Sequence, residues 1–82
     1  MLTKKKKIIY ERIKKILSEQ FEIENVDLDT VIREDLNLDS IGILEFVMAM
    51  EEEFGQMIED DKLDEIITIK DAVDYIEGRS KE

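Results

Sequence analysis

The sequence predicts an all-α fold: a small bundle of three main helices plus one short helix, with a long loop between the first two helices. Apolar residues recur at helical spacing in three segments, and a glycine follows two of these segments. A hydrophobic fraction of 43% supplies a core for one domain, residues 1–82. We expect its ends, residues 1–3 and 79–82, to be disordered.

The first helix is expected from Thr3 to about Gln20. Its apolar residues follow the i, i+4, i+7, i+8 spacing of an amphipathic helix, at Ile9, Ile13, Ile16 and Leu17. Lys4 to Lys7 lie at its N-terminal end, where the helix dipole disfavours cations. The first turn should therefore fray unless these lysines meet carboxylates from elsewhere in the domain.

Helical spacing is lost between Glu22 and Asp39, which predicts a long loop with a turn at Leu28–Glu34. Loops of this length in small domains are usually functional or contain a short helix. The clearest helix follows, from Ser40 to Phe54, with Gly55 as its C-cap.

The two sides of this second helix differ in composition. At 100° per residue, one side is a core face formed by Ile43, Phe46, Val47, Met50 and Phe54. The opposite side alternates apolar and acidic residues, namely Ile41, Glu45, Met48 and Glu52. Exposed apolar residues between acids are unusual for a purely solvated surface.

Two further helices are expected towards the C-terminus. Asp60 to Glu65 has the character of a brief helix of one or two turns. The last helix runs from Ile69 to about Glu77, with Thr68 as its N-cap and Gly78 ending it.

Cysteine and histidine are both absent. Their absence excludes a disulfide framework, a thiolate zinc site and a cysteine nucleophile, and removes the usual general base.

An EF-hand calcium loop starting at Asp27 would need glycine and glutamate where the chain has Ile32 and Leu38. We therefore expect no metal site. Nor do we expect an enzyme, because so small a domain offers no obvious cleft to shift carboxylate pKa values.

The net charge is −10, which argues against nucleic acid as a partner. The charge is uneven, because residues 1–18 carry seven basic side chains against one acid and residues 19–82 carry five against 21. No apolar stretch approaches the length of a membrane span. These observations predict a soluble, cytoplasmic monomer without membrane contact, and leave the role of Lys4 to Lys7 open.

Asp39 and Ser40 precede and begin the strongest helix. Both residue types are common helix N-caps, so the pair alone has a purely structural interpretation. A helix N-terminus also stabilises a phosphodiester on such a hydroxyl. No histidine, and no basic residue within six positions, is available to make Ser40 a nucleophile, so chemistry there would need another enzyme.

The sequence resembles the acyl carrier proteins over nearly its whole length. The matching runs are Glu34 to Ile41, Glu45 to Phe54, Ile66 to Ile69 and Asp71 to Ile76. The resemblance implies that a transferase attaches 4′-phosphopantetheine from coenzyme A to Ser40. The arm would then carry acyl intermediates as thioesters to enzymes of fatty acid biosynthesis, while the carrier itself catalyses nothing.

The resemblance also implies roles for two sets of side chains. Residues expected to recognise the transferase and basic patches on acyl-transfer and condensing enzymes are Asp39, Ile41, Glu45, Met48, Glu51 and Glu52. Residues expected to line the acyl pocket are Ile32, Phe46, Met50, Phe54, Ile58, Leu63, Ile66, Ala72 and Ile76.

The chain departs from the family pattern at several positions. Gly42 stands where relatives usually have an acid, Leu63 where alanine is common, and Arg33 in a normally acidic or apolar stretch. A specialised carrier for a polyketide, non-ribosomal peptide or D-alanyl transfer pathway is therefore an alternative. The remaining alternative is an unmodified acidic helical interaction module, in which Ser40 is only part of a cap.

Overall fold

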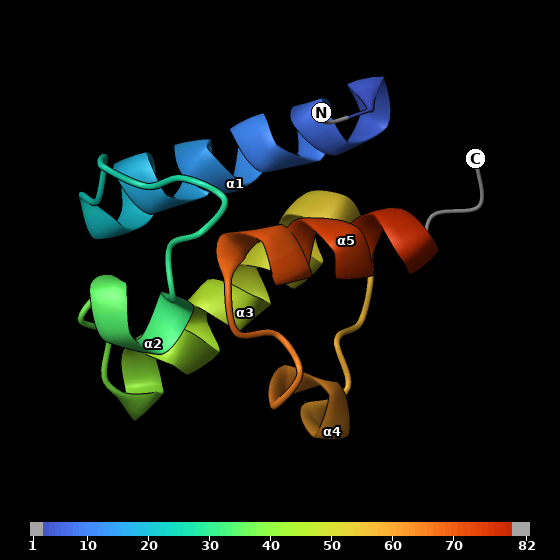
Figure 1. The fold of residues 1–82 in the computed structure, drawn as a ribbon. Helices are drawn as coiled ribbons and strands as arrows, with labels where there is room; N and C mark the ends of the chain where they lie inside the picture. The colour runs from blue at the N-terminus through green and yellow to red at the C-terminus, as the bar shows by residue number, and fades with distance from the viewer. Residues whose placement is uncertain (1–2, 80–82) are drawn as a thin grey trace.

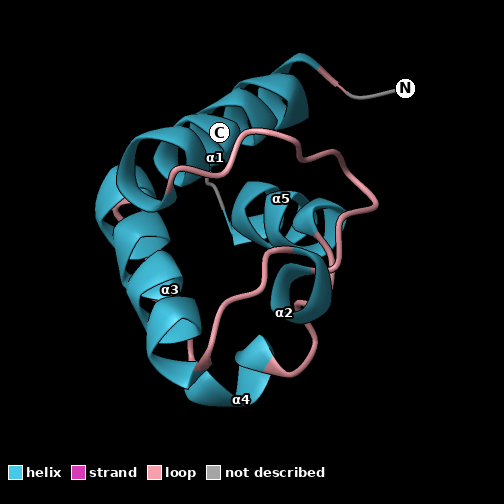
Figure 2. Cartoon of the chain, turned by 90° about the vertical axis from the view of Figure 1, so that its left-hand side faces the viewer, coloured by secondary structure: helices cyan, strands magenta, loops and turns pink. Residues whose placement is uncertain are grey.

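A computed structural model describes residues 3–79 and confirms the all-α class. Five helices follow in order (Figure 1): α1 (Lys4–Phe21), α2 (Ile32–Asp35), α3 (Ser40–Phe54), α4 (Asp60–Leu63) and α5 (Ile69–Arg79). The long helices α1, α3 and α5 form the bundle, whereas α2 and α4 lie on its side away from α1 (Figures 1 and 2). The fold thus contains a second short helix, α2, in addition to the one predicted.

The ends of the described region are more ordered than the sequence indicated. Thr3 caps α1, because its hydroxyl accepts a hydrogen bond from the Lys6 N–H at 3.1 Å. Gly78 does not end α5, which continues through Arg79. A glycine inside a helix costs only about 1 kcal/mol relative to alanine, so it does not by itself stop the helix. The rest of the predicted disorder lies outside the described residues.

The core lies where α1, α3 and α5 meet. It is formed by Ile9, Ile13, Ile16, Leu17, Ile32, Leu36, Phe46, Val47, Met50, Ile58, Ile69, Ala72, Val73 and Ile76. Phe46 of α3 is fully buried, and its ring meets that of Phe21 edge to face with centroids 6.0 Å apart. The core face predicted for α3 is therefore confirmed at Phe46, Val47 and Met50, with Ile43 and Phe54 partly buried beside it.

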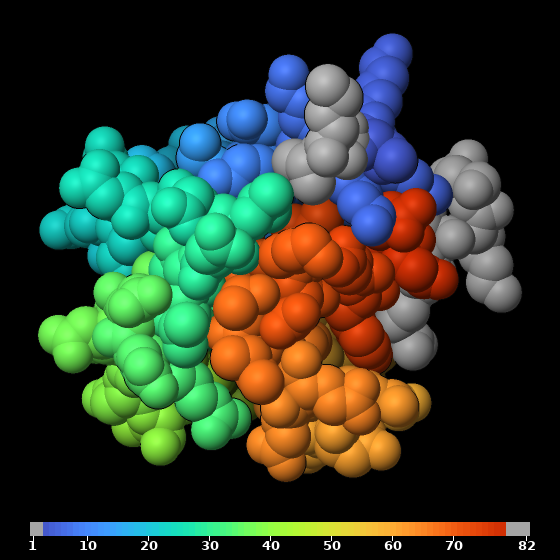
Figure 3. Space-filling view, viewed as in Figure 1, coloured from blue at the N-terminus to red at the C-terminus, as the bar shows by residue number. Residues whose placement is uncertain are grey.

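The loop after α1 is fastened to the start of α5. The Ile32 N–H donates to the Ile67 carbonyl at 2.8 Å, and the Ile69 N–H donates to the Thr30 carbonyl at 3.0 Å. The Lys70 N–H adds a third bond, to the Leu28 carbonyl. Figure 3 shows this segment packed against the beginning of α5. A turn does occur at Leu28, as predicted, but the chain then enters α2 at Ile32.

The first turn of α1 meets the carboxylate that its stability requires. Lys6 Nζ lies 2.9 Å from Asp74 Oδ1 of α5. This hydrogen-bonded ion pair raises the pKa of Lys6 and lowers the pKa of Asp74. Arg12 forms a second ion pair, with Glu53 of α3 at 3.2 Å.

Within residues 3–79, no helix is both long enough and apolar enough to cross a membrane.

Candidate functional site

Ser40 is the first residue of α3 and is exposed. The helix is capped by the residue before it, because the Asp39 carboxylate accepts from the Gly42 N–H at 2.8 Å. The Asp39 carbonyl accepts from the Ile43 N–H at 2.9 Å, the first hydrogen bond of the helix. Asp39 therefore performs the capping, and the Ser40 hydroxyl has no hydrogen-bond partner among the residues that the structure describes.

Gly42 keeps the first turn of α3 compact. A Cβ atom at this position would lie 3.2 Å from Leu38 Cβ and Cδ2, and 3.3 Å from the capping oxygen of Asp39. These are close contacts, and the neighbours would have to move by a few tenths of an ångström. The structure thus gives a packing reason for glycine where the family resemblance led us to expect an acid.

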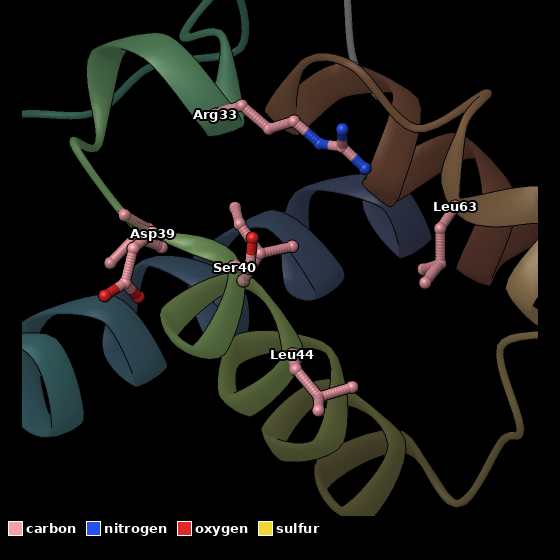
Figure 4. Close-up of a pocket in the computed structure, with 7 residues that line it drawn as sticks. Arg33, Asp39, Ser40, Leu44 and Leu63 are labelled. Atoms are coloured by element: carbon pink, nitrogen blue, oxygen red, sulfur yellow. The ribbon is translucent and has the colours of Figure 1, made fainter.

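The Ser40 side chain opens onto a surface hollow of about 540 Å³ (Figure 4). Three helices and the segment before α3 form its wall: Arg33, Leu38, Asp39, Ser40, Ile43, Leu44 and Leu63. Its size falls within the range of small-molecule sites in proteins, roughly 300–1,000 Å³. Apart from Ser40 and the charged residues Arg33 and Asp39, the wall is apolar.

A much smaller cavity, about 20 Å³, lies deeper between α2, α3 and α4. It is lined by Ile32, Arg33, Ile43, Phe46, Val47, Met50, Leu63 and Ile66. Arg33, Ile43 and Leu63 line both spaces, so the hollow and the cavity adjoin. The volume of the deeper cavity is enough for about one water molecule, which requires roughly 10–15 Å³. It must widen before a hydrocarbon chain enters.

The residues expected to form an acyl pocket separate into three groups. Five of the nine line the deeper cavity: Ile32, Phe46, Met50, Leu63 and Ile66. Ile58 and Ala72 are buried elsewhere in the core. Phe54 and Ile76 line a different hollow, next to the N-terminal half of α1. Phe54 lies one turn beyond Met50 on the same side of α3, and that additional turn carries it past the cavity to α1.

Sequence reasoning did not assign Arg33, Leu38, Ile43, Leu44 or Val47 to the site. Ile43 and Val47 belong to the predicted core face of α3, so helical spacing contained the information needed to find them. No pattern in the sequence placed Arg33 there, because its position depends on where the loop and α2 are fastened.

The outward side of α3 presents most of the residues expected to meet partners. Ile41 and Met48 expose 66% and 51% of their surface, and Glu45 and Glu52 are also exposed. Glu51 differs, because its half-buried carboxylate accepts from the Ile58 N–H at 2.8 Å. This residue holds the segment between α3 and α4 in place, a role that its position on the helix did not reveal.

Comparison with known proteins identifies the family. Residues 11–76 match a family model described as "Phosphopantetheine attachment site". The chain is 41% identical over 73 residues to the acyl carrier protein of Nitratidesulfovibrio vulgaris (strain DP4), covering 87% of this chain and 96% of the relative. It is 49% identical over 69 residues to that of Zymomonas mobilis, covering 82% and 88%. The chain belongs to the acyl carrier protein family.

A solved structure supports the same conclusion. The acyl carrier protein from Enterococcus faecalis superposes with a TM-score of 0.76 and 40% sequence identity, covering 92% of this chain and 98% of that one. The family match indicates attachment of phosphopantetheine. Ser40 of this acyl carrier protein suits that group, because it is exposed, borders the hollow and, within residues 3–79, donates no hydrogen bond through its hydroxyl.

Proposed function

We propose that this acyl carrier protein carries acyl intermediates as thioesters on a 4′-phosphopantetheine arm attached to Ser40, and presents them to enzymes of fatty acid biosynthesis. One observation carries the proposal: an unengaged, exposed serine hydroxyl begins a 15-residue helix and opens onto an apolar hollow. The chain acts as a carrier, and the reactions on its cargo belong to its partners.

Attachment requires a nucleophilic oxygen and a base. Ser40 Oγ attacks the diphosphate phosphorus of coenzyme A that carries the pantetheine. A new O–P bond forms, the bond from that phosphorus to the bridging oxygen breaks, and adenosine bisphosphate leaves while the base takes the hydroxyl proton. The transferase supplies the base, because no histidine exists in the chain and, among residues 3–79, the one carboxylate in the wall of the hollow is that of Asp39, which caps α3. The N-terminus of α3 then stabilises the negative phosphodiester through its N–H groups and dipole.

The outward side of α3 is the proposed surface for the transferase and for basic patches on acyl-transfer and condensing enzymes. Glu45 and Glu52 provide negative charge, and the exposed Ile41 and Met48 provide apolar contacts between them. Charge complementarity raises association rates, and the small contact area allows rapid release. A carrier that visits several enzymes in the cytoplasm as a monomer requires both properties.

Intact-mass measurement tests the proposal. The protein is incubated with coenzyme A and a promiscuous phosphopantetheinyl transferase. The wild type and the control Ser18→Ala, which alters a serine of α1, should each gain the mass of one phosphopantetheine. Ser40→Ala should gain none and keep the wild-type melting temperature, because Asp39 still caps α3. If the wild type gains no mass, the chain is instead an unmodified acidic module. If Ser40→Ala is modified, Ser40 is not the attachment site and the proposal fails.

A specialised pathway is the second candidate. The small deeper cavity, which Leu63 narrows from the α4 side, favours short acyl groups over long ones. Mass spectrometry of the protein isolated from its own host distinguishes the two, because it measures the acyl group on the arm directly. Long saturated chains would support fatty acid biosynthesis, and short or substituted groups would support the specialised carrier.

A further inference from the structure

Arg33 occupies a particular position in the site. Its side chain projects from α2 towards Leu63 of α4. The Ser40 hydroxyl oxygen points towards the Arg33 side of the hollow (Figure 4). Arg33 lines the hollow and also the deeper cavity. Among the described residues that line either space, it is the one basic side chain.

The protein itself makes little use of the Arg33 guanidinium group. Its ion-pair partner is Asp64, whose Oδ1 lies 3.9 Å away, and the two side chains are 62% and 85% exposed. That distance exceeds a hydrogen bond, and exposed pairs of this kind contribute little to stability. A guanidinium carries five N–H donors in a planar fork that matches the two oxygens of a carboxylate or phosphate.

The surroundings favour an external anion over an internal one. Asp39, the one acid among the described residues in the wall of the hollow, already accepts from the Gly42 N–H. The remaining wall consists of Ser40 and four apolar side chains. The Arg33 side chain is 62% exposed, so an anion on the arm can reach the guanidinium from solvent.

We propose that Arg33 is the oxyanion-binding residue of the hollow and holds an anionic group of the arm carried on Ser40. This inference rests on the proposed function and extends it to the arm and its cargo. Two groups share the required chemistry: the phosphodiester next to Ser40 and the terminal carboxylate of a short acyl cargo. A short cargo stays within reach of Arg33, because Arg33 lines both the hollow and the deeper cavity.

The test compares four states of one protein. The transferase loads Ser40 from coenzyme A, pentanoyl coenzyme A or glutaryl coenzyme A, giving the free-thiol, neutral-acyl and carboxylate-acyl forms beside the unmodified form. Pentanoyl and glutaryl have the same number of carbons, so they differ at the terminal group. Melting temperatures are measured at low salt for the wild type, Arg33→Gln and Arg33→Lys. Arg12→Gln removes an equal charge from α1 and serves as the control.

Contact with the phosphodiester would raise the melting temperature of all three loaded forms over the unmodified form by about 2 to 5 °C. Contact with the cargo would raise that of the glutaryl form alone. In either case Arg33→Gln should abolish the rise, Arg33→Lys should retain part of it, and Arg12→Gln should retain all of it. The Arg33 Nε–H resonance of labelled protein should shift in the same loaded forms.

The two possible failures are distinguishable. If the wild type gains no mass with coenzyme A, the proposed function fails and this inference fails with it. If loading is normal but neither the melting temperature nor the Arg33 resonance of any loaded form differs from that of the unmodified form, the inference alone is wrong. The same conclusion follows if Arg33→Gln and Arg12→Gln behave alike.

Discussion

Replacing Asp39 by alanine removes the acceptor that holds the Gly42 N–H at 2.8 Å, and should destabilise the protein without touching its core. Loss of an aspartate N-cap costs about 1 kcal/mol, and loss of its charge at the helix N-terminus adds about 0.5 kcal/mol. For a domain of this size, about 1.5 kcal/mol lowers the melting temperature by roughly 6–12 °C.

Asp39→Asn is the matched comparison, because the amide oxygen can still accept from Gly42 while the charge is lost. Asparagine caps helices about as well as aspartate, so this variant should melt only about 2–4 °C below the wild type. Thermal unfolding followed by circular dichroism at 222 nm measures both differences.

The reasoning is refuted if Asp39→Ala has the melting temperature of the wild type, or if Asp39→Asn is destabilised as much as Asp39→Ala. If the predicted difference is found, Asp39→Asn can also be used to study recognition by the transferase. Because Asp39→Asn keeps the cap, slower modification of this variant by the transferase would report recognition of the carboxylate charge, separately from the folding of α3.

Three further predictions concern stability. The Lys6–Asp74 ion pair lowers the pKa of Asp74, so the stability advantage of the wild type over Asp74→Asn should be fully present above the ordinary carboxyl pKa of 3.8. It should disappear as the pH falls through the lowered pKa; a gap in melting temperature that persists in strong acid would contradict the assignment. Phe46→Ala should cost about 3–5 kcal/mol, a large part of a typical domain's stability, whereas Phe46→Leu should cost much less; urea titration checks both. Glu22 adopts φ = 58° at the end of α1, a conformation that glycine adopts more easily, so Glu22→Gly should stabilise the protein by up to about 1 kcal/mol. A urea midpoint at or below that of the wild type would show that this position carries no strain.

The boundaries of α3 could be predicted to the residue, because both ends carry strong local signals. Asp39 supplies a side-chain cap, and Gly55 adopts the left-handed conformation with φ = 63°. The end of α5 was harder to predict, since Gly78 is a weak stop signal inside an otherwise favourable helix. Local signals therefore placed Ser40 at the start of α3, whereas its role as an attachment site was implied by the resemblance to the acyl carrier proteins.

Features that depend on tertiary contacts could not be predicted in the same way. Helix α2 is a single turn without its own periodicity, and it is fixed by hydrogen bonds such as Ile32 N–H to the Ile67 carbonyl. The position of Arg33 depends on that attachment. Glu51 was expected to meet partners, but its carboxylate accepts a hydrogen bond from the Ile58 N–H of the segment after α3. A helical projection gives the direction of a side chain and does not say which distant segment meets it.

The long helices α1, α3 and α5 form most of the core, whereas the short helices α2 and α4 border the site, so the site can change shape while the core stays packed. Fully buried side chains such as Ile13 and Phe46 join α1 and α3 to the rest of the core. The hollow and the deeper cavity are instead bordered by α2 and α4. These helices are single turns that depend on tertiary contacts and would not persist alone. Leu63 of α4 is only partly buried, so moving α4 outward exposes little apolar surface and leaves the contacts of α1 with α3 and α5 intact. Widening the cavity therefore draws on the least stable elements of the fold, as local opening in proteins generally does.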